Sequence, residues 1–373
     1  MMDTRITRLA DLLINYSTNT QPGEKLLVEM FGFSPLPLLK EVITIATRKG
    51  IILHHHIYEN GASRRFLLDA SDDQIADQAT HALQRMKDMD CYLGIRSSDN
   101  IAEMSDVPPD RMKAYQNLVV NPVHLEERVK NTRWCVLRWP NASMAQQASQ
   151  PVEVFEDFYF KVCTLDYAKM NEAMGPLSEK MAQADEVHIK APGTDLRLSI
   201  RGIPNRKCSG SHNIPDGELF TAPIRDSVNG TIVFNAGATH ESVSYSEITL
   251  TFENGKIVKA ESPENADKLN AVLDRDEGAR YVGEFSFGFN PHILDPMKDT
   301  LFDEKIAGSI HMAMGQAYEE CDNGNRSMVH WDMVHIQRPE YGGGEIHFDG
   351  ELIRKDGLFV PTELEGLNPE NLV

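Results

Sequence analysis

The chain has 373 residues, of which 41% are hydrophobic and 25% are charged, so it carries enough apolar material for a sizeable core in one or two domains. The formal net charge of −19 argues against a nucleic-acid partner, because phosphate binding needs clustered Lys and Arg. No stretch of the sequence is apolar over the length needed to cross a membrane. We therefore expect neither a nucleic-acid partner nor a membrane partner.

The cysteines and the first residues predict the cellular location. The five cysteines are scattered and never form a CxxC pair, which is typical of free thiols in a reducing compartment rather than of disulfides or a thiolate zinc site. The first 17 residues predict an amphipathic helix with Leu9, Leu12, Leu13 and Tyr16 on one face. They lack the apolar core and cleavage site of a signal peptide. Cytoplasm is therefore the expected location.

In the first half, short apolar runs alternate with helical patterns. Strands are predicted at residues 25–30, 51–58, 90–96 and 133–138, and helices at 36–49, 73–86 and 112–118. Strands that alternate with helices predict right-handed crossovers and a parallel sheet. The first strand–helix junction, GFSPLPLL, is not a GxGxxG loop, so no dinucleotide-binding motif is present there.

The second half has a different pattern. Residues 155–184 predict one or two long helices, and the pattern from Asp185 onward is mostly β. Asn254 and Gly255, flanked by alternating residues, predict a hairpin. We expect an α/β domain with a mostly parallel sheet over residues 1–180. A β-rich α+β domain that carries the metal site should follow over residues 181–373.

Several polar residues of the second half lie beside turns or apolar runs. They are Glu218, Glu284, His311, His330 and Asp332. In a strand, residues i and i+2 point to the same face, so His330 and Asp332 could bind one metal ion together.

Nitrogen and carboxylate ligands without a thiolate suit Zn, Co, Mn or Fe(II). The set is large enough for two ions, which in many aminopeptidases share a carboxylate at a separation of roughly 3.5–4 Å. Each residue taken singly has a simpler interpretation, as a surface Glu or a hydrogen-bonded core His. The His run at 54–56 is interpreted as structural, because adjacent strand residues face opposite ways. Met312, Met314 and residues 285–289 are interpreted as core.

The order and spacing of several blocks resemble the thermophilic-aminopeptidase family of dinuclear metallopeptidases, the aminopeptidase T and S type. The similarity spans nearly the whole chain and is strongest from about residue 190. The blocks are APGTDLRLSIRG, NIPDGELFTAP, NGTIVF, DEGARYVGE, DEKIAGSIHMAMGQAY and NRSMVHWD.

This resemblance implies that Glu218 is a metal ligand and that Glu284 is shared by both ions. His311, His330 and Asp332 would complete the ligand set. The chain departs from the family in a shorter loop between residues 318 and 330 and in a divergent tail, both around the expected substrate pocket.

Two further residues enter through the resemblance. Glu304 would match another family ligand, although its spacing to His311 is longer here. Tyr318, seven residues after His311, matches an active-site tyrosine that could donate to an oxyanion. Glu284 or Glu304 could shuttle the proton.

The expected function is therefore that of a hydrolase, a metal-dependent aminopeptidase. It would remove N-terminal residues from small peptides with water activated by two divalent ions, either Zn, Co or Mn. The resemblance also implies a homodimer whose active sites face an internal cavity.

Two alternatives remain open. A mononuclear Fe(II) ring-cleaving dioxygenase of the dihydroxypyridine type resembles the same family in fold and keeps two histidines and an aspartate, but lacks the bridging glutamate. Because Glu284 and Glu218 are both present here, two metals are favoured. The non-enzymatic alternative is a peptide-binding protein with a decayed site.

Overall fold

The computed structural model describes residues 3–241 and 243–373. The chain divides into two compact units, one made of Met1–Thr164 with Gly210–Pro215 and the other of Leu165–Ser209 with Asp216–Val373. The domain boundary expected near residue 180 stays a prediction.

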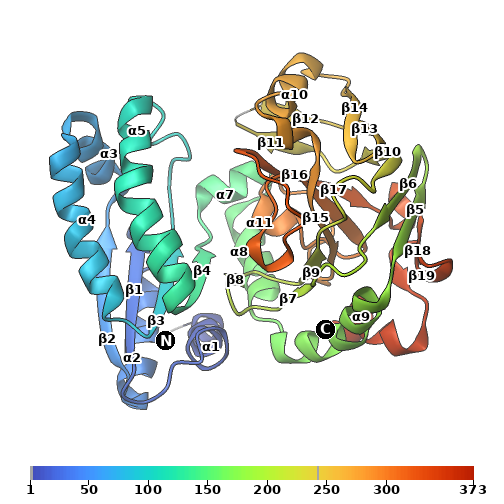
Figure 1. Cartoon of the computed structure of the whole chain (residues 1–373). Helices are drawn as coiled ribbons and strands as arrows, with labels where there is room; N and C mark the ends of the chain where they lie inside the picture. The colour runs from blue at the N-terminus through green and yellow to red at the C-terminus, as the bar shows by residue number, and fades with distance from the viewer. Residues whose placement is uncertain (1–2, 242) are drawn as a thin grey trace. The chain divides into compact units, whose positions relative to one another are not determined.

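The first unit is built on a parallel five-stranded sheet of order β2-β1-β3-β4-β8, with helices packed on it (Figure 1). This confirms the α/β fold class. The strands are β1 (Lys25–Phe31), β2 (Ile52–Tyr58), β3 (Cys91–Arg96), β4 (Arg133–Arg138) and β8 (Asn213–Ile214). The α-helices are α1 (Thr4–Leu12), α2 (Leu36–Lys49), α3 (Asn60–Asp69), α4 (Asp72–Lys87), α5 (Pro109–Tyr115), α6 (Val129–Asn131), α7 (Ala142–Gln147) and α8 (Val152–Cys163).

Local sequence explains most of these boundaries. The middle of β1 is buried throughout, as expected for a strand covered on both faces. Helix α2 ends at Gly50, whose φ of 78° is the left-handed conformation of a helix C-cap. Ser71 and Gln74 form a capping box at the start of α4. The helix expected over 112–118 extends further, because α5 continues into a π-helical stretch, Gln116–Arg128.

The second unit contains two large sheets, and its antiparallel pairings confirm the β-rich class. An eight-stranded sheet has the order β14-β13-β10-β6-β5-β18-β19-β20, and a five-stranded sheet has the order β17-β16-β15-β9-β7. The first sheet comprises β5 (Glu186–Ala191), β6 (Thr194–Ser199), β10 (Asn229–Phe234), β13 (Ile248–Glu253), β14 (Lys256–Glu261), β18 (Glu345–Phe348), β19 (Glu351–Lys355) and β20 (Leu358–Phe359). The second comprises β7 (Arg206–Cys208), β9 (Glu218–Thr221), β15 (Val282–Gly288), β16 (Ser309–Gly315) and β17 (His330–Ile336).

Helices, a hairpin turn and two short strands complete this unit. Helix α9 (Tyr167–Gln183) precedes the sheets, and with α8 it shows that the one or two long helices expected over 155–184 are two. The hairpin expected at Asn254 and Gly255 joins β13 to β14, and both residues have positive φ. The remaining elements are β11 (Ala238–His240), β12 (Val243–Tyr245), α10 (Ala266–Leu273), α11 (Thr300–Asp303) and α12 (Pro369–Leu372).

Aromatic packing joins the two sheets of this unit. The ring of Phe287 on β15 lies 6.1 Å from Phe348 on β18 and 6.0 Å from Phe359 on β20, measured between centroids. The buried guanidinium of Arg354 lies 5.0 Å from the Phe287 ring and donates a hydrogen bond to the Ser309 carbonyl. Since strand residues alternate between faces, the opposite face of β15 is left free for polar groups.

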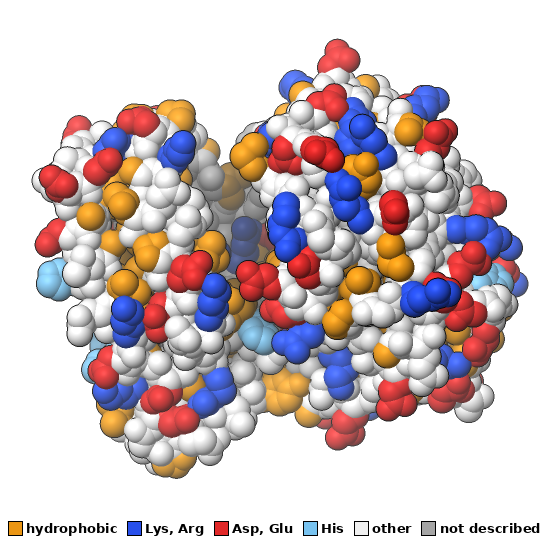
Figure 2. All heavy atoms as spheres, in the orientation of Figure 1, with side chains coloured by type: hydrophobic (Ala, Val, Ile, Leu, Met, Phe, Trp, Pro, Cys, Tyr) orange, Lys and Arg blue, Asp and Glu red, His pale blue; other side chains and the backbone are white. Residues whose placement is uncertain are grey.

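Figure 2 shows that Asp and Glu side chains are interspersed with Lys and Arg side chains on the visible face of each unit. Among the residues that the structure describes, no helix is both long enough and apolar enough to cross a membrane.

Candidate metal centre

The register of the five-stranded sheet brings the predicted ligands onto one face. Glu284 on β15 pairs with Ala313 on β16, and Ala313 pairs with Asp332 on β17. Ser286, two residues after Glu284, pairs with His311. Residues that pair directly across an antiparallel sheet share a face, so Glu284, His311 and Asp332 project from the same side.

The other two predicted ligands join this face from the flanking strands. Glu218 begins β9 and pairs with Gly288 on β15, an even number of residues from Glu284. His330 begins β17 two residues before Asp332. Figure 1 shows β15, β16 and β17 side by side in the second unit.

A β-bulge at Gly283 sets the position of Glu284. The register shifts between Val282, which pairs with Met314, and Glu284, which pairs with Ala313. A Cβ atom at Gly283 would lie 2.4 Å from the Gly315 carbonyl oxygen, so only glycine fits there. Bulges re-aim side chains in this way, and here the result is a carboxylate that points toward the histidines.

Glu284 lies between the two histidines. Its Oε1 is 3.0 Å from His311 Nε2, and its Oε2 is 3.6 Å from His330 Nε2. His311 Nε2 is also 3.5 Å from Glu218 Oε2, and His330 Nε2 is 3.5 Å from Asp332 Oδ1. Five of the six residues predicted as ligands, all but Glu304, therefore form one contiguous cluster in which each Glu284 oxygen faces a different imidazole.

The outer nitrogens of both histidines bond to the backbone. His311 Nδ1 lies 3.1 Å from the Glu304 carbonyl, and His330 Nδ1 lies 2.8 Å from the Gln316 carbonyl. A carbonyl only accepts, so each Nδ1 carries the proton and each Nε2 faces the carboxylates. This outer contact is typical of metal-binding histidines, since it fixes the tautomer that presents Nε2 to the ion.

The donor set fits divalent cations. Glu218 Oε2 is buried and accepts no hydrogen bond from the described residues. Among the described contacts of this oxygen is His311 Nε2 at 3.5 Å, and a buried carboxylate oxygen is costly unless a cation or a donor satisfies it. The described carboxylate and imidazole groups form two triads with ligand atoms within 4.8 Å of one another, Glu218–Glu304–His311 and Glu284–His311–Asp332.

Glu304 joins the cluster through its neighbour in the chain, Lys305. Lys305 is fully buried, and its Nζ lies 3.3 Å from Glu218 Oε1 and forms a shorter ion pair with Glu304. Although burial lowers the pKa of Lys305, the carboxylates of Glu218 and Glu304 raise it well above 10.5 overall. Glu304 is among the residues predicted from the sequence, whereas Lys305 is not, because a lysine directly before an apolar run is its only sequence signal.

Without metal, the cluster holds protons on its histidines. Burial lowers the pKa of His311, but its hydrogen bond to Glu284 raises it to about 9 overall. Asp332 likewise raises the pKa of His330 to about 10, against the effect of burial. Burial raises the pKa of Glu304 to about 8. The Nε2 atoms of His311 and His330, which would bind a metal ion, are therefore protonated at neutral pH when no metal is bound.

Tyr318 borders the cluster. Its ring lies 4.7 Å from the His330 ring and 5.6 Å from the Phe220 ring. The residue is half exposed, and desolvation of its hydroxyl together with the charge of Glu284 raises its pKa well above 10. The phenol therefore keeps its proton at neutral pH and can donate a hydrogen bond.

The sequence as a whole matches one family model. Residues 2–359 match the model of the thermophilic metalloproteases, M29. This chain belongs to the M29 family. It is accordingly a hydrolase with a divalent metal cofactor, and the resemblance stated from its sequence is confirmed.

Individual M29 relatives extend over the full chain. Aminopeptidase 2 of Geobacillus stearothermophilus is 24% identical over 98% of this chain and 97% of its own length. Aminopeptidase T of Thermus thermophilus is 26% identical over 97% of each chain.

Solved structures support the fold. Wild-type AmpT from Thermus thermophilus superposes with a TM-score of 0.80 at 22% identity, over 96% of this chain and 100% of that one. A 2,5-dihydroxypyridine dioxygenase from Pseudomonas putida superposes with a TM-score of 0.63 at 14% identity, over 96% and 98% of the two chains. At these identities both matches show the fold only, so the dioxygenase alternative gains no chemical support.

A small pocket of this M29 enzyme adjoins the cluster. Glu304 and Asp332 contribute to its wall, together with Trp331 and the small residues Ala236 and Gly237. Trp331 stacks on His240 with ring centroids 4.3 Å apart. The pocket therefore lies beside the candidate ligands Glu304 and Asp332.

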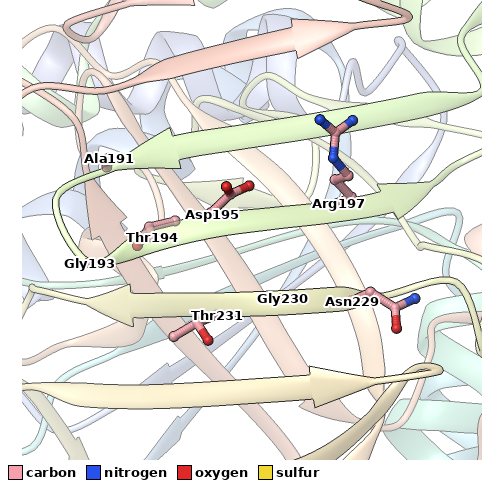
Figure 3. A pocket seen from close by; sticks show the side chains of 8 residues that line it. All are labelled: Ala191, Gly193, Thr194, Asp195, Arg197, Asn229, Gly230 and Thr231. Carbon is pink, nitrogen blue, oxygen red and sulfur yellow. The ribbon is translucent and has the colours of Figure 1, made fainter.

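A second hollow lies elsewhere. Figure 3 shows eight residues that line it, from the end of β5, the turn before β6, and strands β6 and β10, among them Asp195, Arg197 and Asn229. None of the candidate ligands belongs to it. We assign it no part in the chemistry.

The histidine run at 54–56 lies on β2, the edge strand of the first unit. All three residues are exposed, and the described metal-ligand groupings do not include them. Met312, Met314, Phe285 and Phe287 are buried, as expected for core residues.

Proposed function

We propose that this metalloprotease is an aminopeptidase that removes N-terminal residues from small peptides at a centre of two divalent ions. The observation that carries the proposal is the position of Glu284, with one oxygen toward each histidine. A carboxylate in this position can bridge two ions. The names of the full-length relatives support the exopeptidase activity.

The charges around the centre support two ions. One fully buried ammonium, that of Lys305, faces a larger number of carboxylates that are buried or nearly so. The carboxylates of the candidate ligands are those of Glu218, Glu284, Glu304 and Asp332. When all of them are ionised they outnumber this ammonium, and divalent cations such as Zn, Co or Mn would balance the excess of negative charge.

The first triad and the contacts of His330 suggest the ligand assignment. Glu218, Glu304 and His311 would hold one ion, and His330 with Asp332, whose Nε2 and Oδ1 lie 3.5 Å apart, would hold the other. Glu284 would be shared.

The bound ions would supply an activated water and polarise the scissile carbonyl. Glu304 lies at the rim of both the cluster and the pocket, so its carboxylate would take the proton of the water and pass it to the leaving amine. The Tyr318 hydroxyl would donate to the oxyanion of the tetrahedral intermediate. The ions would also offer a binding site to the free α-amino group of a peptide, which would favour the removal of N-terminal residues.

Hydrolysis of chromogenic substrates tests this proposal. The full chain is treated with a chelator, reloaded with Zn, Co or Mn, and offered Leu- and Arg-p-nitroanilide. We expect metal-dependent release of nitroaniline, with N-acetyl-Leu-p-nitroanilide, which lacks the free amine, left uncleaved. If the protein binds metal and cleaves none of the free-amine substrates, the aminopeptidase proposal is wrong.

Assembly and location are part of the proposal. A homodimer is supported by the family resemblance, and light scattering coupled to size-exclusion chromatography would measure its mass. A cytoplasmic location is supported by the five cysteines, all of which are free thiols.

A further inference from the structure

Lys305 is a buried cation held firmly in place. Its side chain is fully buried, and its backbone N donates to the Phe302 carbonyl at 3.0 Å while its own carbonyl accepts from Asn290 at 2.9 Å. Its ammonium pairs with Glu218 and Glu304. Ammonium and carboxylates are buried together, which is how a buried lysine remains charged.

The ammonium contacts only one half of the centre. Glu218 and Glu304 belong to the triad with His311, which would hold one of the two ions. In the described part of the chain, no hydrogen bond or ion pair joins Lys305 to Glu284, His330 or Asp332. The positive charge is therefore distributed unevenly between the two halves.

This asymmetry has two consequences for metal binding. The ammonium already neutralises part of the negative charge that would attract an ion to Glu218, and it repels that ion. It also engages one oxygen of Glu218 and one of Glu304, so these two oxygens are weaker ligands for a metal than oxygens without an ammonium partner. The charge of the ammonium also reaches Asp332, but in the described part of the chain its direct ion pairs are with Glu218 and Glu304, so its effect on a metal is stronger in the Glu218 half.

We propose that Lys305 acts as a permanent cation in the Glu218 half of the centre, so that the two ions bind with unequal affinity and the ion at Glu218 is the weaker. This inference rests on the proposed two-ion function. Lys305 is a positioning residue in this scheme, because it contacts ligands and not the substrate. The enzyme would retain one ion on purification and gain the second from free metal, so occupancy of the Glu218 half would regulate activity.

Stepwise titration of the metal-free full chain with Co²⁺, followed by calorimetry and by the visible absorption of bound cobalt, tests the proposal. The native protein should bind two equivalents whose dissociation constants differ by roughly a hundredfold. In Lys305→Met the ratio of the two dissociation constants should fall by about tenfold or more, because the weaker-binding ion would bind more tightly. Lys305→Arg keeps the charge and should preserve the unequal steps.

The control for folding is circular dichroism of each metal-free variant. If Lys305→Met does not fold, Lys305→Gln removes the charge while keeping a hydrogen-bond donor, and the same narrowing is expected. If neither folds, the native titration decides. Two native steps of equal affinity, or a folded neutral variant whose ratio is unchanged, would overturn the proposal.

The same measurements distinguish failure of the Lys305 proposal from failure of the proposed aminopeptidase function. Peptide turnover at saturating metal together with equal affinities would overturn the role of Lys305 and leave the aminopeptidase intact. Unequal affinities without turnover of any free-amine substrate would support Lys305 and overturn the aminopeptidase. Binding of a single equivalent would overturn the two-ion centre and, with it, this inference.

Discussion

At the level of single residues, Glu284 is the carboxylate that lies close to both histidines of the cluster. It contacts both histidines and is only 4% exposed. Burial raises its pKa, and the hydrogen bond from His311 opposes that shift. A buried carboxylate with two imidazole partners is stable only while positive charge remains beside it, either a proton or a metal ion.

Glu284→Gln keeps the shape of the side chain and removes its charge. We expect metal affinity and turnover to fall by more than about a hundredfold, because a lost ligand costs at least as much as a lost outer contact. Metal content after gel filtration and hydrolysis of Leu-p-nitroanilide measure the two effects. The matched control is Glu264→Gln, an exposed position that should change neither. Full activity in Glu284→Gln would show that the centre lies elsewhere.

Tyr318→Phe tests the proposed oxyanion contact. The variant removes one hydroxyl and keeps the ring contacts with His330 and Phe220. We expect kcat to fall by about 10²–10³-fold, the usual effect of removing one oxyanion donor, with little change in KM or metal content. Steady-state kinetics separate these quantities. A change in KM with kcat preserved would assign Tyr318 to substrate binding instead.

At the scale of elements, the sheet positions the site. The register of β9, β15, β16 and β17 gathers residues that are up to 114 positions apart, from Glu218 to Asp332. The aromatic face of β15 packs on the eight-stranded sheet and anchors the polar face from behind. The bulge at Gly283 is the one irregularity of β15 in this region, and it determines where Glu284 points.

Gly283→Ala tests the bulge. The added Cβ would meet the Gly315 carbonyl oxygen at 2.4 Å and the Gln316 carbonyl oxygen at 2.5 Å. We expect a loss of roughly 1–3 kcal/mol in the free energy of unfolding, as for overpacking elsewhere, together with weaker metal binding. Urea unfolding and metal titration measure both.

The matched control for this variant is Gly175→Ala in α9, where a Cβ meets no atom within 4 Å. There we expect a gain of about 0.5–1 kcal/mol, because alanine is the better helix residue. If Gly283→Ala is as stable as the native chain and binds metal normally, the bulge does not set the site.

At the scale of the whole molecule, charge links metal binding to stability. The chain carries a formal net charge of −19, and its candidate ligands lie within the second unit. The metal-free centre compensates its carboxylates with protons on His311 and His330. Any change in proton or metal occupancy should therefore change the stability of the protein.

The metal-free protein should lose stability as the pH rises. The folded-state pKa values of His311 and His330, about 9 and about 10, lie above the ordinary 6.5. Groups with raised pKa values stabilise the fold fully below pH 6.5 and lose that contribution as the pH passes through about 9 to 10. Glu304, raised from 4.5 to about 8, acts in the same direction.

Calorimetric Tm values of metal-free and metal-loaded protein between pH 6.5 and 10 check this prediction. We expect Tm to fall with pH in the metal-free form only. In the loaded form a metal replaces the protons, and its affinity grows as the histidines deprotonate. Parallel curves for the two forms would mean that these histidines do not bind the metal.

Local sequence accounts for most of the helices and strands and for the chemistry of the candidate ligands. Periodicity predicts the parallel sheet of the first unit and the helix over 36–49, and Asn254 with Gly255 predicts a hairpin, because these features depend on neighbouring residues. The residue types at Glu218, Glu284, His311, His330 and Asp332 indicated a metal site without thiolates. Their order along the chain indicated the family.

The tertiary structure decided what depends on distant pairing. Strand register and the Gly283 bulge bring Glu284 between His311 and His330, and neither can be derived from local sequence, because each requires knowing which strands are neighbours. The same holds for Lys305. A lysine beside a glutamate is usually solvated, and only packing shows that this one is buried against two carboxylates of the centre.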